Sequence, residues 1–316
     1  MLQLLLGGSG SGKTTLLYQR IRARAEKGEK SILLVPEQFT SSTEGRIYRE
    51  LGDALSGMVE SFSFTSLAEK ILSTEGGAAV QTLSDAGRAV LVRRALEELQ
   101  DNVHYYHRHR RSAAFCQMAA QTIDELKSAG LSGQQLAQLA GACGAESGKL
   151  SELALIFQGY ETLLARSGMD PSDRLELAGA RLEEALARHS LPEFLRDRAV
   201  FIDEFDTFNA PKKRLLGAML AALPSVTVAL CDDGAPLLPG DLSLFSGAKQ
   251  VAAQLRQLAR KNGAEVAVPQ LLRKDLRHRN APGLAAVAEL LETGSCTADA
   301  PAGEVRLFAA PSREEE

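Results

Sequence analysis

Short apolar runs alternate with amphipathic stretches along most of this chain. Five runs rich in apolar and β-branched residues predict buried strands, at residues 2–6, 31–35, 58–62, 199–202 and 226–230. A weaker sixth run occupies residues 264–268. Helical patterns lie between the first three runs and again between the fourth and fifth. This alternation predicts an α/β fold, a doubly wound parallel sheet with helices on both faces.

The middle of the chain departs from this alternation. Its apolar residues recur at the three-to-four spacing of amphipathic helices, and β-branched runs are almost absent. Helices are predicted at residues 85–99, 113–130, 148–168 and 170–190. Asp170 followed by Pro171 predicts the N-cap and first turn of the last helix.

The two patterns together predict the domain organisation. Residues 1–82 and 196–275 are expected to form one discontinuous α/β domain, and residues 83–195 a large all-helical insertion within it. Residues 276–316 are expected to begin a second, truncated domain, because the strand-like run at 305–310 has no visible partner. The sequence therefore resembles part of a longer polypeptide.

The first apolar run leads directly into a GxxxxGK[ST] phosphate-binding loop. Glycines let backbone N–H groups surround a polyphosphate without intruding Cβ atoms, and a helix predicted from Thr14 to about Ala25 directs its positive end at the phosphates. Lys13 is expected to contact the β- and γ-phosphates as a catalytic residue, and Thr14 to bind Mg²⁺. The predicted ATP-binding residues of this loop are Gly7, Gly8, Ser9, Gly10, Ser11, Gly12, Lys13, Thr14 and Thr15.

A second motif places two carboxylates after the fourth apolar run. Asp203 and Glu204 follow residues 199–202 directly. In a nucleotide-binding protein with such a loop, the first carboxylate typically holds the Mg²⁺ shell and the second polarises the attacking water. We therefore predict that Asp203 is a ligand of the Mg²⁺ ion that binds together with the nucleotide, and that Glu204 is a catalytic residue.

Composition narrows the class of protein. The chain has 316 residues, 45% hydrophobic and 24% charged, as in ordinary globular proteins. It shows neither an apolar run long enough for a membrane span nor a leader pattern, so a cytoplasmic protein without a membrane partner is expected. The four cysteines are widely spaced, which indicates neither a zinc ribbon nor a disulfide framework. A net charge of −4 means that any nucleic-acid site must be a local patch.

One such patch lies inside the helical stretch, at residues 102–111. It contains three histidines, three arginines and two tyrosines. Arginines hold phosphates and tyrosines stack on bases, so Tyr105 and Arg108 are candidate DNA contacts. The alternative is a solvated basic loop. A metal bound by His104 and His107 is disfavoured because the neighbouring arginines would repel a cation.

Three segments in order resemble a known family. LLVPEQ at residues 33–38, SFSFTSLA at 61–68 and DEFDTF at 203–208 resemble the RecA-like superfamily 1 helicase core, and specifically the amino-terminal part of the AddB/RexB family. The resemblance extends over nearly the whole chain.

The resemblance implies function and partners. It implies processing of double-stranded DNA ends for recombinational repair, binding of single-stranded DNA and duplex ends, and a heterodimer with an AddA-type helicase-nuclease subunit. It also implies a nuclease domain with an iron–sulfur cluster, which is not expected within these residues. Gln38, Thr40 and Ser63 lie where this fold places its single strand and are predicted DNA contacts. The alternative is that these polar side chains serve only the local turns.

Departures from the helicase pattern predict a weak or lost motor. The glutamine of DExQD is absent because Asp206 follows Phe205 directly. The glutamine of GDxxQ is absent too, because only residues 230–234 represent this motif. Arg279, or its neighbour Arg277, falls where an arginine motif stabilises transition-state charge, and the alternative is an ordinary surface arginine. Two other functions remain open: a phosphotransferase with a helical acceptor-binding lid, and a structural module that binds nucleotide without hydrolysis.

Overall fold

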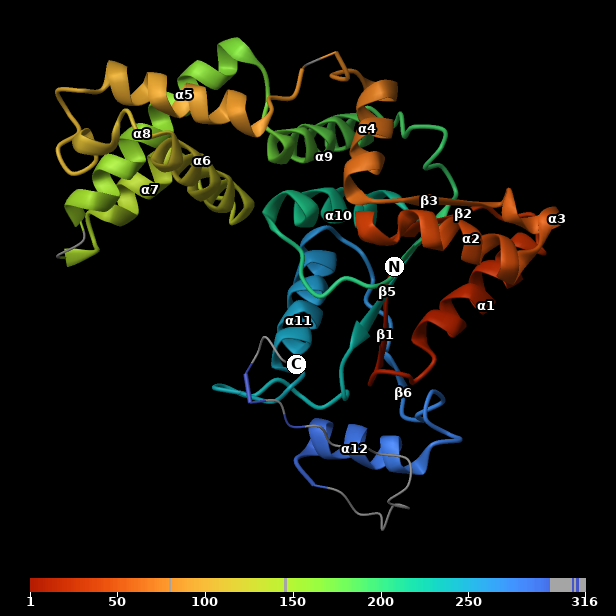
Figure 1. Cartoon of the computed structure of the whole chain (residues 1–316). Coiled ribbons are helices and arrows are strands. Elements are labelled where there is room, and N and C mark those ends of the chain that lie inside the picture. Colours follow the sequence, from red (N-terminus) through yellow and green to blue (C-terminus); the bar gives the residue numbers. More distant parts are fainter. Residues whose placement is uncertain (80, 145–146, 296–308, 310, 313–316) are drawn as a thin grey trace.

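A computed structural model describes residues 1–79, 81–144, 147–295, 309 and 311–312. Within them, six parallel strands form one sheet in the order β3-β2-β4-β5-β1-β6. This confirms the α/β class and the five main predicted strands (Figure 1). The strands are β1 (Leu2–Gly7), β2 (Ser31–Leu34), β3 (Val59–Phe62), β4 (Ala199–Ile202), β5 (Ser225–Cys231) and β6 (Gln270–Leu272).

Helices cover both faces of this sheet because its strands are apolar on both sides. Adjacent residues of β1 show this: Leu4 belongs to the core on one face and Leu5 to the core on the other. The Leu5 face packs on α1 (Lys13–Ala25), α2 (Thr40–Leu51) and the short α3 (Asp53–Ser56). The Leu4 face packs on α4 (Phe64–Glu75), α9 (Pro171–Ala187), α10 (Ala210–Ala222) and α11 (Ser246–Lys261).

The sixth strand was predicted in the wrong place. Residues 264–268 form only an isolated bridge, between Val266 and Leu2. The N–H of Ala264 donates to the carbonyl of Ala259 at the end of α11 and so is not available to β1. Pro269 then offers no N–H to a ladder. Regular pairing with β1 therefore begins at Gln270.

The predicted helices of the central stretch are confirmed, and four helices there form a separate lobe. They share a second apolar core, built around Phe157 and Tyr160, that lies apart from the sheet (Figure 1). They are α5 (Asp85–Glu98), α6 (Ala113–Ser128), α7 (Gly133–Ala140) and α8 (Ser147–Ser167). Helix α7 was not predicted from the sequence.

Helix α9 lies between the lobe and the sheet. It begins as predicted, with Asp170 as N-cap in a capping box with Asp173. Its buried residues Leu175, Ala178 and Leu182 belong to the sheet core, where the helix packs against α4 and α10. The last predicted helix of the insertion thus packs on the α/β part, while the domain limits remain a prediction.

A buried polar network joins the lobe to α9. Lys127 of α6 donates to Asp170 at 2.7 Å and to Asp173 at 2.8 Å. The Tyr160 hydroxyl of α8 donates to the other Asp170 oxygen at 2.6 Å. Burial alone lowers the pKa of Lys127, but its hydrogen bonds to the two aspartates outweigh burial and raise it. The network therefore links α6, α8 and α9 through the ammonium group of Lys127 and the two carboxylates that it contacts.

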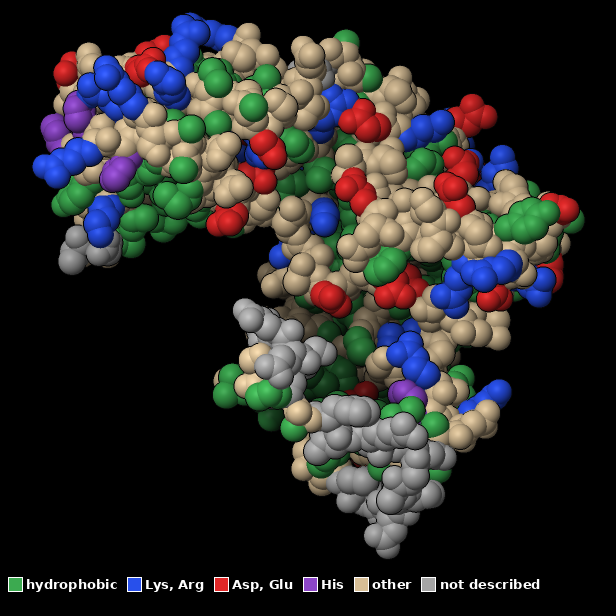
Figure 2. All heavy atoms as spheres, viewed as in Figure 1, with side chains coloured by type: hydrophobic (Ala, Val, Ile, Leu, Met, Phe, Trp, Pro, Cys, Tyr) green, Lys and Arg blue, Asp and Glu red, His purple; other side chains and the backbone are tan. Residues whose placement is uncertain are grey.

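The remaining segments complete the described chain. Helix α12 (Pro282–Thr293) follows β6. Most of the strand-like run at 305–310 lies outside the described residues. In the part of the chain described above, no helix combines the length and apolar character needed to cross a membrane. The space-filling view shows the lobe overhanging a concave side of the molecule (Figure 2).

Candidate nucleotide site

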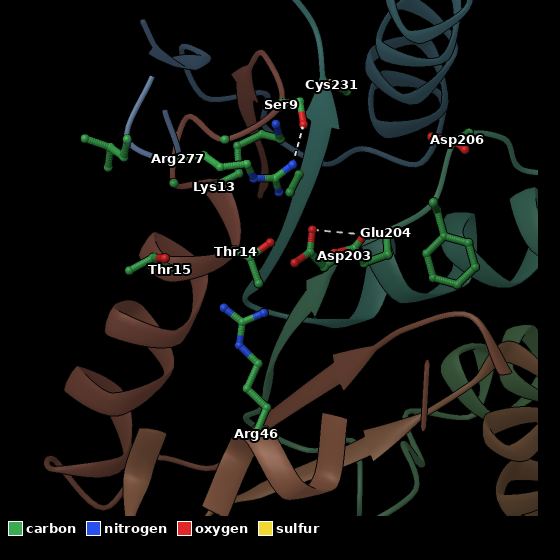
Figure 3. Close-up of a pocket in the computed structure, with 15 residues that line it drawn as sticks. Ser9, Lys13, Thr14, Thr15, Arg46, Asp203, Glu204, Asp206, Cys231 and Arg277 are labelled. Carbon is green, nitrogen blue, oxygen red and sulfur yellow. Dashed lines mark hydrogen bonds between the residues drawn. The ribbon is translucent and has the colours of Figure 1, made fainter. Parts of the chain in front are cut away.

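The carboxyl edge of the sheet contains a cavity of about 500 Å³. Parallel strands point their carboxyl ends to one edge, so segments far apart in sequence meet here (Figure 3). The lining residues are Ser9, Gly10, Gly12, Lys13, Thr14, Thr15, Arg46, Asp203, Glu204, Phe205, Asp206, Ala229, Cys231, Leu276 and Arg277.

The glycine-rich loop between β1 and α1 has the backbone that the sequence predicts. Gly10 and Gly12 adopt φ of +77° and +89°, in the left-handed region that favours glycine. A Cβ on Gly7 would lie 2.7 Å from the Leu272 carbonyl oxygen, too close for any side chain. The buried Ser11 hydroxyl has no hydrogen-bond partner among the described residues, and it lines a neighbouring pocket and not this cavity. The tight, glycine-rich backbone is the feature of the loop that fits a polyphosphate.

Lys13 closes the loop from the side of α1. Its Nζ donates to the Gly7 and Gly8 carbonyls, at 2.7 Å each. The ammonium group is therefore held against the loop, and Lys13 also lines the cavity. Thr15 is farther from the carboxylates, on the outer side of α1 (Figure 3).

Thr14 and the acidic motif meet across the cavity. The Thr14 hydroxyl points toward Asp203, which is only 6% exposed at the end of β4 (Figure 3). Burial raises the pKa of Asp203, and the neighbouring Thr14 hydroxyl partly offsets this rise. A hydroxyl beside a carboxylate is the oxygen pair that Mg²⁺ takes together with nucleotide phosphates. No cluster of three or more His, Cys, Asp or Glu able to hold a metal occurs among the described residues.

Glu204 occupies a strained position beside Asp203. Its φ is +63°, although it is not glycine, and its N–H donates to Asp203 Oδ1 at 3.0 Å. Left-handed backbone at ordinary residues concentrates at functional sites. The side chain is exposed and lines the cavity.

Of the two candidate arginines, Arg277 lines the cavity and Arg279 is not among the lining residues. Arg277 Nη1 donates to Ser9 Oγ at 3.1 Å. The preceding residue fixes this arrangement, because the Leu276 N–H donates to the Gly10 carbonyl at 3.0 Å. The segment after β6 therefore packs directly on the glycine-rich loop.

Arg46 is a cavity residue that the sequence did not reveal. It extends from α2 toward Thr14 and Asp203 (Figure 3). Its guanidinium lies 4.8 Å from the centroid of the Tyr18 ring, which holds it by a cation–π contact. No motif surrounds Arg46, so only the fold places its charge beside the two carboxylates.

The predicted DNA contacts after β2 and β3 come together at the same sheet edge. Ser63 Oγ lies 3.5 Å from Glu37 Oε1, which joins the two segments. Ser63 is 4% exposed and caps α4, and the Thr40 hydroxyl donates to the Glu37 carbonyl at 2.8 Å. Gln38 is exposed in a short 3₁₀ turn, Glu37–Phe39. Their contacts with DNA remain predictions.

The other predicted DNA contacts, Tyr105 and Arg108, lie on the helical lobe and not at this edge.

The segment after β5, where the GDxxQ glutamine is missing, has a structural role. Asp232 is 2% exposed, and its Oδ1 accepts the Gly234 N–H at 2.7 Å. The carboxylate therefore closes a turn after β5.

The chain is similar to proteins of one family. A family model described as "ADDB, N-terminal" matches residues 4–288. The chain is 34% identical, over its full length, to a protein of Desulforudis audaxviator named as the B-type subunit of an ATP-dependent helicase/deoxyribonuclease, of which it covers 27%. Proteins of the same name from Moorella thermoacetica and Symbiobacterium thermophilum are 33% and 31% identical, over 90% and 100% of this chain and 25% and 28% of their own. The chain thus spans about a quarter of these relatives.

Proposed function

We propose, on the premise that this chain belongs to the ADDB N-terminal family, that the chain is the ATP- and DNA-binding, helicase-like region of a helicase-nuclease subunit. This subunit processes double-strand DNA ends for recombinational repair in the cytoplasm. Its partner is an AddA-type subunit, and its DNA is single-stranded or a duplex end. Similarity to proteins named as one subunit of an ATP-dependent helicase/deoxyribonuclease supports this proposal.

One observation carries the ATP part of the proposal. The glycine-rich loop, Lys13, Thr14 and Asp203 line one cavity at the carboxyl edge of a parallel sheet, although they come from opposite halves of the chain. This arrangement supports a RecA-like, superfamily 1 type of nucleotide-binding domain. ATP supplies a γ-phosphoryl group whose transfer to water is the reaction of such sites.

Each side chain has a separate task in this proposal. The loop N–H groups and Lys13 balance the charge of the phosphates, and Thr14 with Asp203 holds Mg²⁺. Glu204 orients the attacking water, and Arg277, which contacts Ser9 of the loop, stabilises charge on the phosphates. Turnover is weakly coupled to movement, because the turn made by Asp232 replaces the glutamine that senses the γ-phosphate.

The first test is ATP turnover with and without single-stranded DNA. The parent is expected to hydrolyse ATP slowly and faster with DNA, and Glu204→Gln to lose about 100-fold in turnover while still binding ATP, because only water activation is removed. Glu44→Gln, at an exposed position of α2, is the matched control. DNA that neither binds nor changes turnover would contradict the helicase-like function. Stimulation by a small phosphate acceptor would favour a phosphotransferase, and binding without turnover a structural module.

The two arginines after β6 provide a second prediction. Arg277→Ala is expected to weaken ATP binding by roughly ten- to hundredfold, because a charge-assisted phosphate contact contributes about 1.5–3 kcal/mol. Arg279→Ala should leave affinity unchanged, since Arg279 does not line the cavity. Isothermal titration with a non-hydrolysable ATP analogue measures both. The reverse order of effects would show that Arg279 reaches the phosphates.

A further inference from the structure

A groove on the helical lobe is separate from the nucleotide cavity. It has a volume of about 490 Å³ and opens to solvent among large side chains, with Tyr105 and Met118 each 57% exposed. Exposed apolar clusters of this kind mark binding surfaces. The groove is lined by Tyr105, Tyr106, His109, Ser112, Ala114, Phe115, Met118 and Lys149.

A buried carboxylate fixes the backbone of this groove. Glu152 of α8 is 6% exposed and accepts the N–H groups of His104 at 2.7 Å, Tyr105 at 2.9 Å and Tyr106 at 3.3 Å. The side chain of Val103, just before them, is 1% exposed in the lobe core. Charge-assisted bonds to three consecutive N–H groups hold the loop rigid, so a ligand meets a preformed surface.

Flat rings form much of that surface. Tyr106 stacks on Phe115 with centroids 5.4 Å apart and planes 28° apart, and His109 lies 5.6 Å from the same phenyl ring. The Tyr105 ring rests on Gly148, where an added Cβ would lie 2.9 Å from its Cε2 atom. Backed rings that remain exposed are the platforms on which nucleobases stack.

The charge beside these rings is positive. Arg108 and Arg111 flank the groove in sequence, and no ion pair or hydrogen bond of their side chains occurs within the described residues. By contrast, Arg94 on α5 is paired with Glu98 at 3.1 Å. Figure 2 shows basic side chains and histidines gathered at this end of the lobe, next to hydrophobic surface. None of the described residues that line the groove is acidic.

We propose that this groove stacks a base of single-stranded DNA on Tyr105, while Arg108 and Arg111 hold the neighbouring phosphates. The proposal rests on the DNA binding proposed above and gives it a second contact, away from the sheet edge. Exposed rings next to exposed guanidinium groups favour a nucleic acid over a peptide, because they match both a flat base and its phosphate charge.

Fluorescence anisotropy of the 316-residue chain tests this with two labelled strands of equal length, oligothymidine and an abasic oligonucleotide. The parent is expected to bind oligothymidine about tenfold tighter, since base stacking accounts for the difference. Tyr105→Leu should remove most of this preference. The double substitution Arg108→Gln with Arg111→Gln should weaken both strands equally and reduce the salt slope by about 1.4.

Two controls match these variants. Tyr48→Leu changes a tyrosine that is 53% exposed on α2, and Arg94→Gln changes an exposed arginine of the lobe. Both should retain the parent affinity and preference, and thermal unfolding by circular dichroism verifies that every variant is folded.

The outcomes separate this inference from the proposed function. Tyr105→Leu binding with an unchanged preference would overturn the groove site and leave DNA binding intact. A parent that binds neither strand would overturn the DNA binding itself. A Tyr105→Leu variant that loses only its association with an AddA-type subunit would show a protein-binding groove, which also overturns the inference.

Discussion

Lys13→Ala is expected to weaken Mg²⁺–ATP binding by roughly ten- to hundredfold, the effect of removing one charged hydrogen-bond donor to phosphate. The loop geometry supports this size of effect. Lys13 Nζ already lies within 2.7 Å of the Gly7 and Gly8 carbonyl oxygens, so its charge is fixed against the loop before ligand arrives. Titration calorimetry with Mg²⁺ and a non-hydrolysable analogue gives the dissociation constant directly.

The control for this prediction is Lys27→Ala, just beyond α1, where the side chain is exposed and outside the cavity. It removes the same charge from the chain but should leave affinity unchanged. The loss in Lys13→Ala should also be larger for ATP than for AMP, because only ATP carries β- and γ-phosphates. Equal losses for both nucleotides would mean that the lysine supports the loop and does not bind phosphate.

Lys127→Met is expected to destabilise the chain by about 3–5 kcal/mol, the effect of leaving a buried charge without its partner. Asp170 is 1% exposed and would retain the Tyr160 hydroxyl, its own capping contacts and the charge of Arg88 nearby, but no cation in direct contact among the described residues. Urea unfolding followed by circular dichroism measures the difference in unfolding free energy. Lys261→Met, at an exposed position in the last turn of α11, should cost less than about 1 kcal/mol.

The ion pair between Lys127 and Asp170 should also make the stability of the chain depend on pH. Because the pKa of Lys127 is raised in the folded state, its contribution is full below the ordinary value of 10.5 and is lost as pH rises through the folded value. The parent should therefore lose stability in this alkaline range more steeply than Lys127→Met. Equal slopes, or a loss below about 1 kcal/mol in Lys127→Met, would show that Asp170 needs no lysine.

Local patterns were sufficient for most of the fold. The strands at β1, β2 and β4 were predictable because buried parallel strands are continuously apolar, and α5, α6, α8 and α9 because their apolar faces repeat with the helical period. The displaced β6 shows the limit. A short run such as residues 264–268 satisfies a strand pattern, but Pro269 and the end of α11 decide where pairing begins.

By itself, the sequence determined the α/β class, the glycine-rich loop and the two carboxylates, because these depend on residues close together in the chain. Only the tertiary structure brought Asp203 to Thr14, placed Arg277 and not Arg279 in the cavity, and added Arg46. The order of the strands and the packing of the helices determine which of these side chains reach the cavity, and neither can be read from a local sequence pattern. The position of a side chain in space, unlike the element that carries it, depends on contacts across the whole fold.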